Sequence, residues 1–281
     1  MGQPRFENKT VVIVGASAGI GAEAARRFAA EGARLVLAAR GADKLRVFAE
    51  SLRAGGTQVL AVPMDLGSDD DCRRLIDVTI ATYGGLDVLV CNAALHHRGP
   101  VEANEADDLA MMVQVNLRAP IFLTRLALPH LRARGGGAVV QVASLAGCIP
   151  TPGSATYSAT KFGLRAFARA LDEELRGSGI RIKVVSPGPV DTGFIMDDLD
   201  RVTNLTLSQP MSTADDVAAA VVDISANDRF ERKMPWKSGL LTTLGYVAPG
   251  FARVMRPVLE RKGENARSRL QARTVIPPRS P

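Results

Sequence analysis

Two side chains that can move a proton stand four residues apart, at Tyr157 and Lys161. In a helix this spacing places them on one face, about 5–6 Å apart at Cβ. An ammonium held close to a phenol stabilises the phenolate, so the tyrosine pKa is expected to fall toward the working range. Tyr157 would then pass a proton to or from a carbonyl oxygen, and Ser144 just upstream would hydrogen-bond that same oxygen.

A Tyr-x-x-x-Lys pair alone more often belongs to a solvated helix surface, so its meaning depends on a nucleotide site. The apolar, β-branched run Thr10–Val14 predicts a parallel strand covered on both faces. A glycine-rich turn, 15–21, follows it and leads into a helical pattern over 22–31. Glycines at such a turn let backbone N–H groups approach a pyrophosphate at a helix N-terminus, and Ser17 would add a hydroxyl.

The end of the next predicted strand, 34–39, indicates which nucleotide binds. About 20 residues past the glycines, a carboxylate usually reads the ribose 2′-hydroxyl of NAD. Arg40 stands at that place, and no carboxylate does. A guanidinium suits a 2′-phosphate, so NADP is favoured over NAD, with a solvated loop arginine as the alternative interpretation.

Further strands are expected at 59–64, 86–90, 138–143 and 180–185, and helical patterns separate them. This alternation predicts one α/β domain built on a doubly wound, Rossmann-type parallel sheet. Ligands bind at the carboxyl ends of such strands. The polar and glycine groups that arrive at these ends are Gly15, Arg40, Asp65, Asn92 and Ser144.

Two other polar positions also allow a structural interpretation. Asn116 is an amide among apolar residues, which either satisfies buried backbone groups or holds a water chain. His96 and His97 have no partner at metal-ligand spacing, so they are interpreted as loop residues.

Composition limits the class of protein. Of the 281 residues, 46% are hydrophobic and 23% charged, which is typical of a globular enzyme. The three cysteines form no C-x-x-C pair, so we expect neither a disulfide framework nor a metal site. No secretory h-region precedes the first strand, and a cytoplasmic location is expected. The net charge of +6 resides in residues 251–281, so a nucleic-acid partner is not expected.

Together these motifs resemble the short-chain dehydrogenase/reductase family over roughly residues 8–225. The resemblance implies about seven strands and reversible hydride transfer between a nicotinamide and a carbonyl or secondary alcohol. It implies Tyr157 as general acid/base, Ser144 as the substrate-positioning hydroxyl, Lys161 on the nicotinamide ribose and Asn116 in a proton relay. The cofactor site that it implies comprises Gly15, Ser17, Gly19, Ile20, Gly21, Arg40, Asp65, Leu66, Asn92, Ala93, Tyr157, Lys161, Pro187, Gly188, Val190 and Thr192.

The carboxyl end departs from the family pattern, because its Asp-Gly-Gly segment is missing. We expect a catalytic domain over 1–230 with a substrate lid at 193–212, a divergent helical segment over 231–265, and a disordered tail over 266–281. Thr213 and Asp216 predict a capping box that opens a helix. Residues 238–252 are uncharged but too short to span a bilayer. Followed by basic residues, they fit an anionic membrane surface, a subunit interface or a pocket cover.

The sequence therefore favours an NADP(H)-dependent ketone reductase or alcohol dehydrogenase that acts on a hydrophobic small molecule, assembled as a homodimer or homotetramer. A nucleotide-binding regulatory protein without catalysis is the second hypothesis, and the complete set of four catalytic residues argues against it. A sugar-nucleotide epimerase or dehydratase also uses a Tyr/Lys pair, but its glycine spacing differs.

Overall fold

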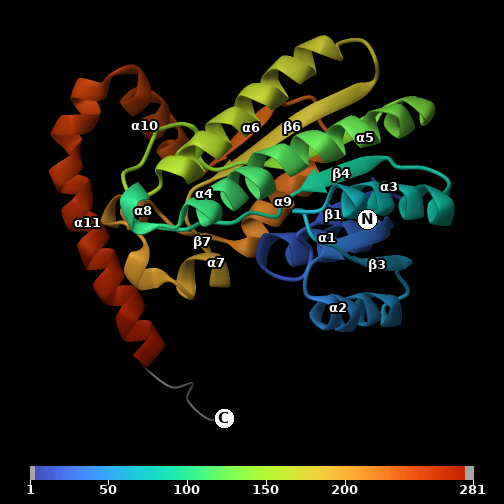
Figure 1. The fold of residues 1–281 in the computed structure, drawn as a ribbon, viewed down its shortest axis with the longest axis horizontal. Coiled ribbons are helices and arrows are strands. Elements are labelled where there is room, and N and C mark those ends of the chain that lie inside the picture. The colour runs from blue at the N-terminus through green and yellow to red at the C-terminus, as the bar shows by residue number, and fades with distance from the viewer. Residues whose placement is uncertain (1–3, 276–281) are drawn as a thin grey trace.

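Seven parallel strands form the central sheet of the computed structural model, which describes residues 4–275 (Figure 1). All five residues of the first strand are buried, as expected for a strand covered on both faces. The predicted seven-stranded, doubly wound α/β fold is confirmed. In sheet order the strands are β3 (Val59–Pro63), β2 (Arg34–Ala39), β1 (Thr10–Val14), β4 (Val88–Cys91), β5 (Gly137–Val142), β6 (Ile180–Pro187) and β9 (Glu231–Met234).

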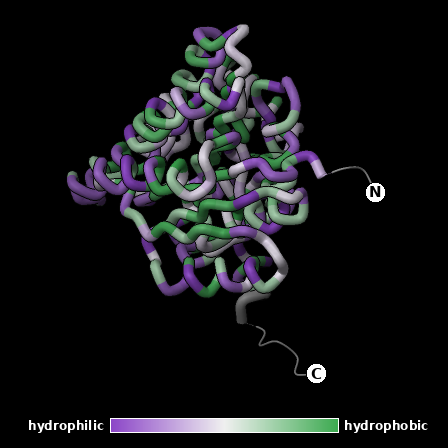
Figure 2. The backbone as a smooth tube through the Cα atoms, turned by 90° about the vertical axis from the view of Figure 1, so that its right-hand side faces the viewer, coloured by the Kyte–Doolittle hydropathy of each residue, from purple (hydrophilic) through white to green (hydrophobic). Residues whose placement is uncertain are grey.

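Helices cover both faces of this sheet, each over its own apolar cluster. Phe28, Leu45 and Val221 belong to the cluster on one face, and Leu75 and Leu123 to the cluster on the other. Figure 2 shows the apolar segments inside and hydrophilic segments outside. The first face carries α1 (Gly19–Ala30), α2 (Ala42–Ala54) and α9 (Ala214–Ser225), and the second carries α3 (Asp69–Tyr83), α5 (Ala119–Ala133) and α6 (Ala155–Glu174).

The strand order reverses beside β1, which pairs with β2 on one side and with β4 on the other. Ligands of open α/β sheets bind in the crevice at such a switch point, beyond the carboxyl ends of the strands. The segments that follow β1, β2, β4, β5 and β6 all leave the sheet at this edge. The topology therefore brings the predicted site segments together.

Short elements beyond β6 form the region predicted as a lid. They are α7 (Gly193–Met196), a 3-10 turn over Leu199–Arg201 and α8 (Asn204–Leu207), with β7 (Val190–Asp191) paired to β8 (Ser212–Thr213). Their apolar residues make a separate small cluster. The predicted capping box is confirmed, because Thr213 Oγ1 accepts from Asp216 N at 3.0 Å and the Asp216 carboxylate accepts from Thr213 N at 3.1 Å.

Two helices complete the chain, α10 (Trp236–Val247) and α11 (Pro249–Val275), and α11 lies along α8 (Figure 1). A Cβ on Gly263 would lie 1.8 Å from the Asn204 carbonyl oxygen, so the backbones meet closely there. Arg267 donates to the carbonyls of Leu199 and Val202. The prediction of a disordered tail over 266–281 was wrong up to Val275, because these contacts hold α11 on the lid; 276–281 lie outside the described residues.

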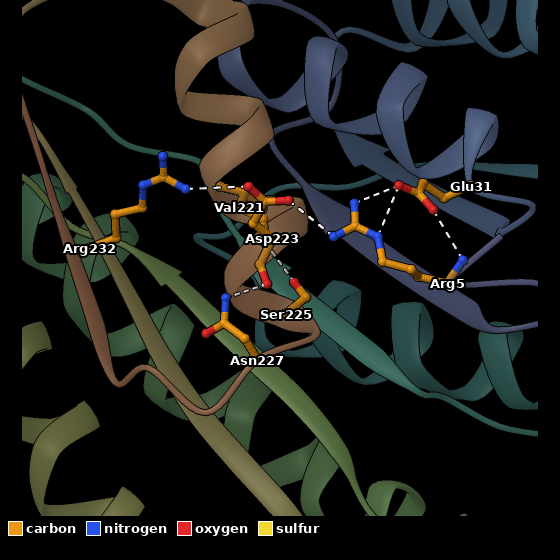
Figure 3. Close-up of polar contacts among 7 residues, drawn as sticks. All are labelled: Arg5, Glu31, Val221, Asp223, Ser225, Asn227 and Arg232. Carbon is orange, nitrogen blue, oxygen red and sulfur yellow. Dashed lines mark hydrogen bonds and ion pairs between the residues drawn. The ribbon is translucent and has the colours of Figure 1, made fainter. Parts of the chain in front are cut away.

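A charged cluster ties the N-terminal segment to α9 (Figure 3). Arg5 pairs with Glu31 and, at 3.0 Å, with Asp223, which also accepts from Arg232 on β9 at 3.4 Å. These groups are partly exposed, so each pair contributes only about 0–1 kcal/mol. None of these charged residues lines the cavity at the carboxyl ends of the strands.

Candidate active site

The glycine-rich turn after β1 is built by close backbone contacts. A Cβ on Gly15, whose φ is +84°, would lie 2.7 Å from the amide nitrogen of Ala93. A Cβ on Gly21 would lie 2.0 Å from the Gly15 carbonyl oxygen. No side chain caps the start of α1, where the first-turn N–H groups and the positive end of the helix dipole lie. This cradle fits a nucleotide pyrophosphate.

Asn92, at the carboxyl end of β4, fastens this turn. Its side-chain nitrogen donates to the Gly15 carbonyl oxygen at 2.9 Å. The backbone N–H groups of Asn92 and Ala93 both donate to the Val14 carbonyl. Asn92 therefore holds the ends of β1 and β4 together beneath the cradle.

Two basic side chains, Arg40 and Lys44, lie at the end of the site beyond β2. Arg40 is exposed and lines the cavity, as does Lys44 in the first turn of α2. Lys44 was not predicted, although a basic residue one helical turn after Arg40 is a readable signal. Asp65 also lines the cavity, while its carboxylate accepts from Gly67 N at 2.9 Å and so shapes the turn after β3.

The proton-transfer group sits where β5 ends and α6 begins. Ser144 follows β5, and its hydroxyl accepts from Ala146 N at 3.1 Å. Tyr157 and Lys161 are both buried on one face of α6, as predicted. The Lys161 ammonium donates to the Val142 carbonyl at 2.9 Å and lies 5.7 Å from the centre of the Tyr157 ring.

Burial dominates the acidities of this pair. It raises the pKa of Tyr157 to about 12, and hydrogen bonding with Ser144 acts in the opposite direction. Burial also lowers the pKa of Lys161 to about 8. The expectation that Lys161 brings the tyrosine pKa down was wrong for this geometry, because the ammonium points at Val142 and desolvation of the phenolate outweighs other effects. Tyr157 is therefore a protonated phenol at neutral pH.

Asn116 lies in a π-helical segment, Gln114–Arg118, inserted between α4 (Ala106–Val113) and α5. The side chain is fully buried. Its oxygen accepts from Leu95 N at 2.7 Å and its nitrogen donates to Leu95 O at 2.8 Å. Asn116 thus holds the loop after β4, and its role in a proton relay stays a prediction.

That loop contributes a residue whose place in the site was not predicted. The His96 ring stacks on Tyr157, with centroids 4.1 Å apart and planes at 14°, and His96 Nε2 lies 3.1 Å from Ser154 Oγ. Burial lowers the pKa of His96 to about 3, so the imidazole is neutral. Phe194 of α7 lies 6.2 Å from His96 and completes a group of three rings. A loop histidine carries no local signal of this contact.

Arg98, two residues further on, connects the loop to the lid. Its buried guanidinium donates to Asp198 at 3.0 Å and to the Phe194 carbonyl at 2.8 Å. Arg201 donates in turn to the Arg98 carbonyl. Hydrogen bonds therefore join the loop after β4 to the lid.

All these elements surround one cavity of about 980 Å³. The predicted site residues line it with two exceptions, Gly21 and Asn116, which lie behind its wall. Pro187, Gly188, Val190 and Thr192 enter from the end of β6, as predicted. The remaining wall is largely apolar and comes from the loop after β5, the lid and the C-terminal helices, with Leu145, Ile149, Phe194, Leu205, Leu241 and Leu259.

Comparisons with known proteins agree with this geometry. The family model "short chain dehydrogenase" matches residues 9–202. The chain is 34% identical over 215 residues to the ketoacyl reductase HetN of a Nostoc species. The aligned residues cover 76% of this chain and 75% of that protein. The chain belongs to the short-chain dehydrogenase/reductase family.

This short-chain dehydrogenase/reductase has other relatives of similar likeness. It is 39% identical over 189 residues to an 11-beta-hydroxysteroid dehydrogenase of Pinus massoniana, covering 66% of this chain but 52% of the pine protein. A crystal structure of a metagenomic short-chain oxidoreductase in complex with NADP superposes with a TM-score of 0.70 at 30% identity, covering 82% of this chain and 98% of that one. The protein is therefore an oxidoreductase acting on CH–OH groups.

Proposed function

We propose that this protein is an NADP(H)-dependent ketone reductase or alcohol dehydrogenase for a hydrophobic small molecule. The observation that carries the proposal is the position of Tyr157 and Ser144 at one cavity wall, with the glycine cradle and two cations at the nucleotide end of the same cavity. A bound nicotinamide supplies or accepts the hydride.

The protein's own groups handle the proton and the oxygen. In the reducing direction, the Tyr157 phenol gives its proton to the oxygen of the carbonyl as the hydride reaches the carbon, and Ser144 holds that oxygen. A phenol with a pKa of about 12 carries its proton at neutral pH, as this step requires. Lys161 binds the nicotinamide ribose, Val190 and Thr192 contact the carboxamide, and Asn116 supports the return of a proton from solvent.

The nucleotide preference rests on Arg40 and Lys44. Both are exposed at the cavity edge beyond β2, where a 2′-phosphate would stand. The solved relative that binds NADP supports the same preference. Asp65 and Leu66 would border the adenine.

The class of substrate follows from the rest of the wall. Apolar side chains from the lid and both C-terminal helices enclose the space beyond Tyr157 and His96. Burying apolar surface there stabilises a hydrophobic ketone or alcohol by about 25 cal/mol per Å². The relatives named for ketoacyl and steroid chemistry agree with such a substrate. We also propose that the protein assembles as a homodimer or homotetramer, and light scattering of the purified protein would measure this.

Calorimetric titration of the purified protein with NADPH and, separately, with NADH tests this proposal. We expect NADPH to bind more tightly by about tenfold or more, because the 2′-phosphate gains charged hydrogen bonds. Binding of neither nucleotide would refute an oxidoreductase function, and tighter binding of NADH would refute the preference.

A further inference from the structure

Helix α10 packs its small and polar residues against the protein and leaves most of its large apolar residues exposed to solvent. Its buried positions are small or polar: Ser238, Gly239, Thr242 and Gly245. Its large apolar residues Trp236, Leu240, Leu244 and Val247 are exposed, Trp236 by 68% and Val247 by 76%. These four recur at intervals of four, four and three residues, so they share one helix face. Lys237 is the one charged side chain that α10 contains.

Helix α11 continues the exposed apolar surface at its start. Phe251, Val254 and Val258 recur at helical spacing, and all three are exposed. Tyr246 is also exposed, but its ring contacts Phe162. We call the other seven exposed large apolar residues of both helices the C-terminal face: Trp236, Leu240, Leu244, Val247, Phe251, Val254 and Val258. Single exposed apolar residues are ordinary, but a contiguous group of this size marks an interaction site.

Positive charge accompanies the C-terminal face. Residues 236–275 hold eight basic and two acidic residues, whereas the rest of the chain holds equal numbers of each. Lys237, Arg253, Arg261 and Lys262 are exposed among or next to the apolar residues. The acids do little to offset them, since Glu260 already pairs with Arg256 at 2.8 Å.

We propose that the C-terminal face binds the surface of a bilayer that contains anionic lipid. An apolar helix face buried at the headgroup boundary, with basic side chains at its margin, is the pattern of interfacial membrane helices. Within the described residues no helix is long and apolar enough to cross a membrane, so α10 and the start of α11 lie in the plane of the surface. Pairing of two copies through this face would bring two strongly positive segments together, which disfavours a dimer there.

The same two helices form part of the cavity wall. Leu241, Thr242 and Gly245 line it from the side of α10 opposite the exposed residues, and Phe251, Met255 and Leu259 line it from α11. Phe251 therefore belongs both to the cavity wall and to the C-terminal face. Docking of the C-terminal face thus places the cavity beside the lipid. If the proposed function holds, a membrane-dissolved hydrophobic substrate reaches Tyr157 without crossing bulk water.

Trp236 is the single tryptophan of the chain and lies in the C-terminal face, so it reports binding directly. The test adds the full-length protein to vesicles of phosphatidylcholine, alone or mixed equally with phosphatidylglycerol. We expect a blue shift of Trp236 emission and co-sedimentation with the anionic vesicles, both weakened by salt. Neither readout needs cofactor or turnover, so the result stands whether or not the proposed activity is correct.

The double variant Leu240→Glu/Val247→Glu should lower vesicle affinity by about tenfold or more, because it places two carboxylates on the apolar face. Val47→Glu/Val101→Glu is the matched control, since it adds the same charge at two exposed apolar residues that lie outside the C-terminal helices. Thermal unfolding curves should show that both variants are folded at the temperature of the binding measurement. Absence of vesicle binding, equal binding to neutral vesicles, or unchanged binding of Leu240→Glu/Val247→Glu would overturn the proposal. So would a concentration-dependent dimer that Leu240→Glu/Val247→Glu abolishes.

Discussion

The imidazole of His96 lies flat against the phenol ring of Tyr157, with the ring centroids 4.1 Å apart. This contact places an uncharged ring over the proposed proton donor, since burial lowers the pKa of His96 to about 3. The histidine therefore acts on Tyr157 by stacking and by excluding water, and its own charge does not change between pH 5 and 8.

We expect His96→Ala to lower kcat about two- to tenfold, the loss of an aromatic pair worth ~0.5–1.5 kcal/mol. His96→Phe should retain most of the turnover because it keeps the stack. The pH profile of the natural protein should show no inflection near the ordinary histidine pKa of about 6.5. If His96→Phe is as impaired as His96→Ala, an imidazole nitrogen and not the stack is required.

The buried ammonium of Lys161 predicts a pH dependence of stability. Its folded-state pKa of about 8 lies below the ordinary 10.5, so between these values the unfolded chain binds more protons than the folded one. The free energy of unfolding contributed by Lys161 should therefore rise with pH over this window, by about 3 kcal/mol at most. Tyr157 acts oppositely above pH 10, because its pKa is raised to about 12.

Denaturant unfolding of the natural protein and of Lys161→Met, measured from pH 7.5 to 10, isolates this contribution. The free energy of unfolding of the natural protein, relative to that of Lys161→Met, should rise with pH over this range. A difference that is constant with pH would mean that Lys161 stays charged in the folded protein.

Arg40→Asp should shift nucleotide preference toward NADH. The carboxylate repels a 2′-phosphate and can accept from a ribose 2′-hydroxyl. We expect the Kd for NADPH to increase by about tenfold or more, with a smaller change for NADH. Lys44→Asp should do the same more weakly. Unchanged selectivity in both variants would show that neither cation reads the phosphate.

The contact between Gly263 and Asn204 predicts that α11 tolerates no side chain at that point. A Cβ there would lie 1.8 Å from the Asn204 carbonyl oxygen, so Gly263→Ala should destabilise the protein by about 1–3 kcal/mol. Gly250→Ala is the control, because nothing lies within 4 Å of its added carbon. Thermal unfolding compares them, and equal melting temperatures would contradict the packing of α11 on α8.

Much of this arrangement was predictable from local patterns. The apolar composition of Thr10–Val14 predicted a buried strand, and the glycines after it predicted a turn with close backbone contacts. The placement of Tyr157 and Lys161 on one face of α6 follows from helical spacing alone. What escaped prediction depends on contacts between distant segments. His96 stacks on a residue 61 positions away, and Gly263 meets Asn204 across two helices.

The same distinction explains the wrong predictions. Lys161 stands at the right spacing from Tyr157, but the ammonium bonds to Val142, 19 residues earlier in the chain. The tail beyond residue 265 has the charge and proline content of a disordered segment, yet Arg267 anchors it to the lid carbonyls. Neither partner is visible in the local sequence.

The central claim is that Tyr157 delivers the proton in a hydride-transfer reaction, and one comparison tests it most directly. NADPH oxidation with a hydrophobic ketone is measured for the natural protein and for Tyr157→Phe, alongside NADPH binding by calorimetry. We predict unchanged binding and a loss of turnover by about 10²–10⁴-fold, the usual contribution of general acid catalysis. Turnover retained in Tyr157→Phe would contradict the account.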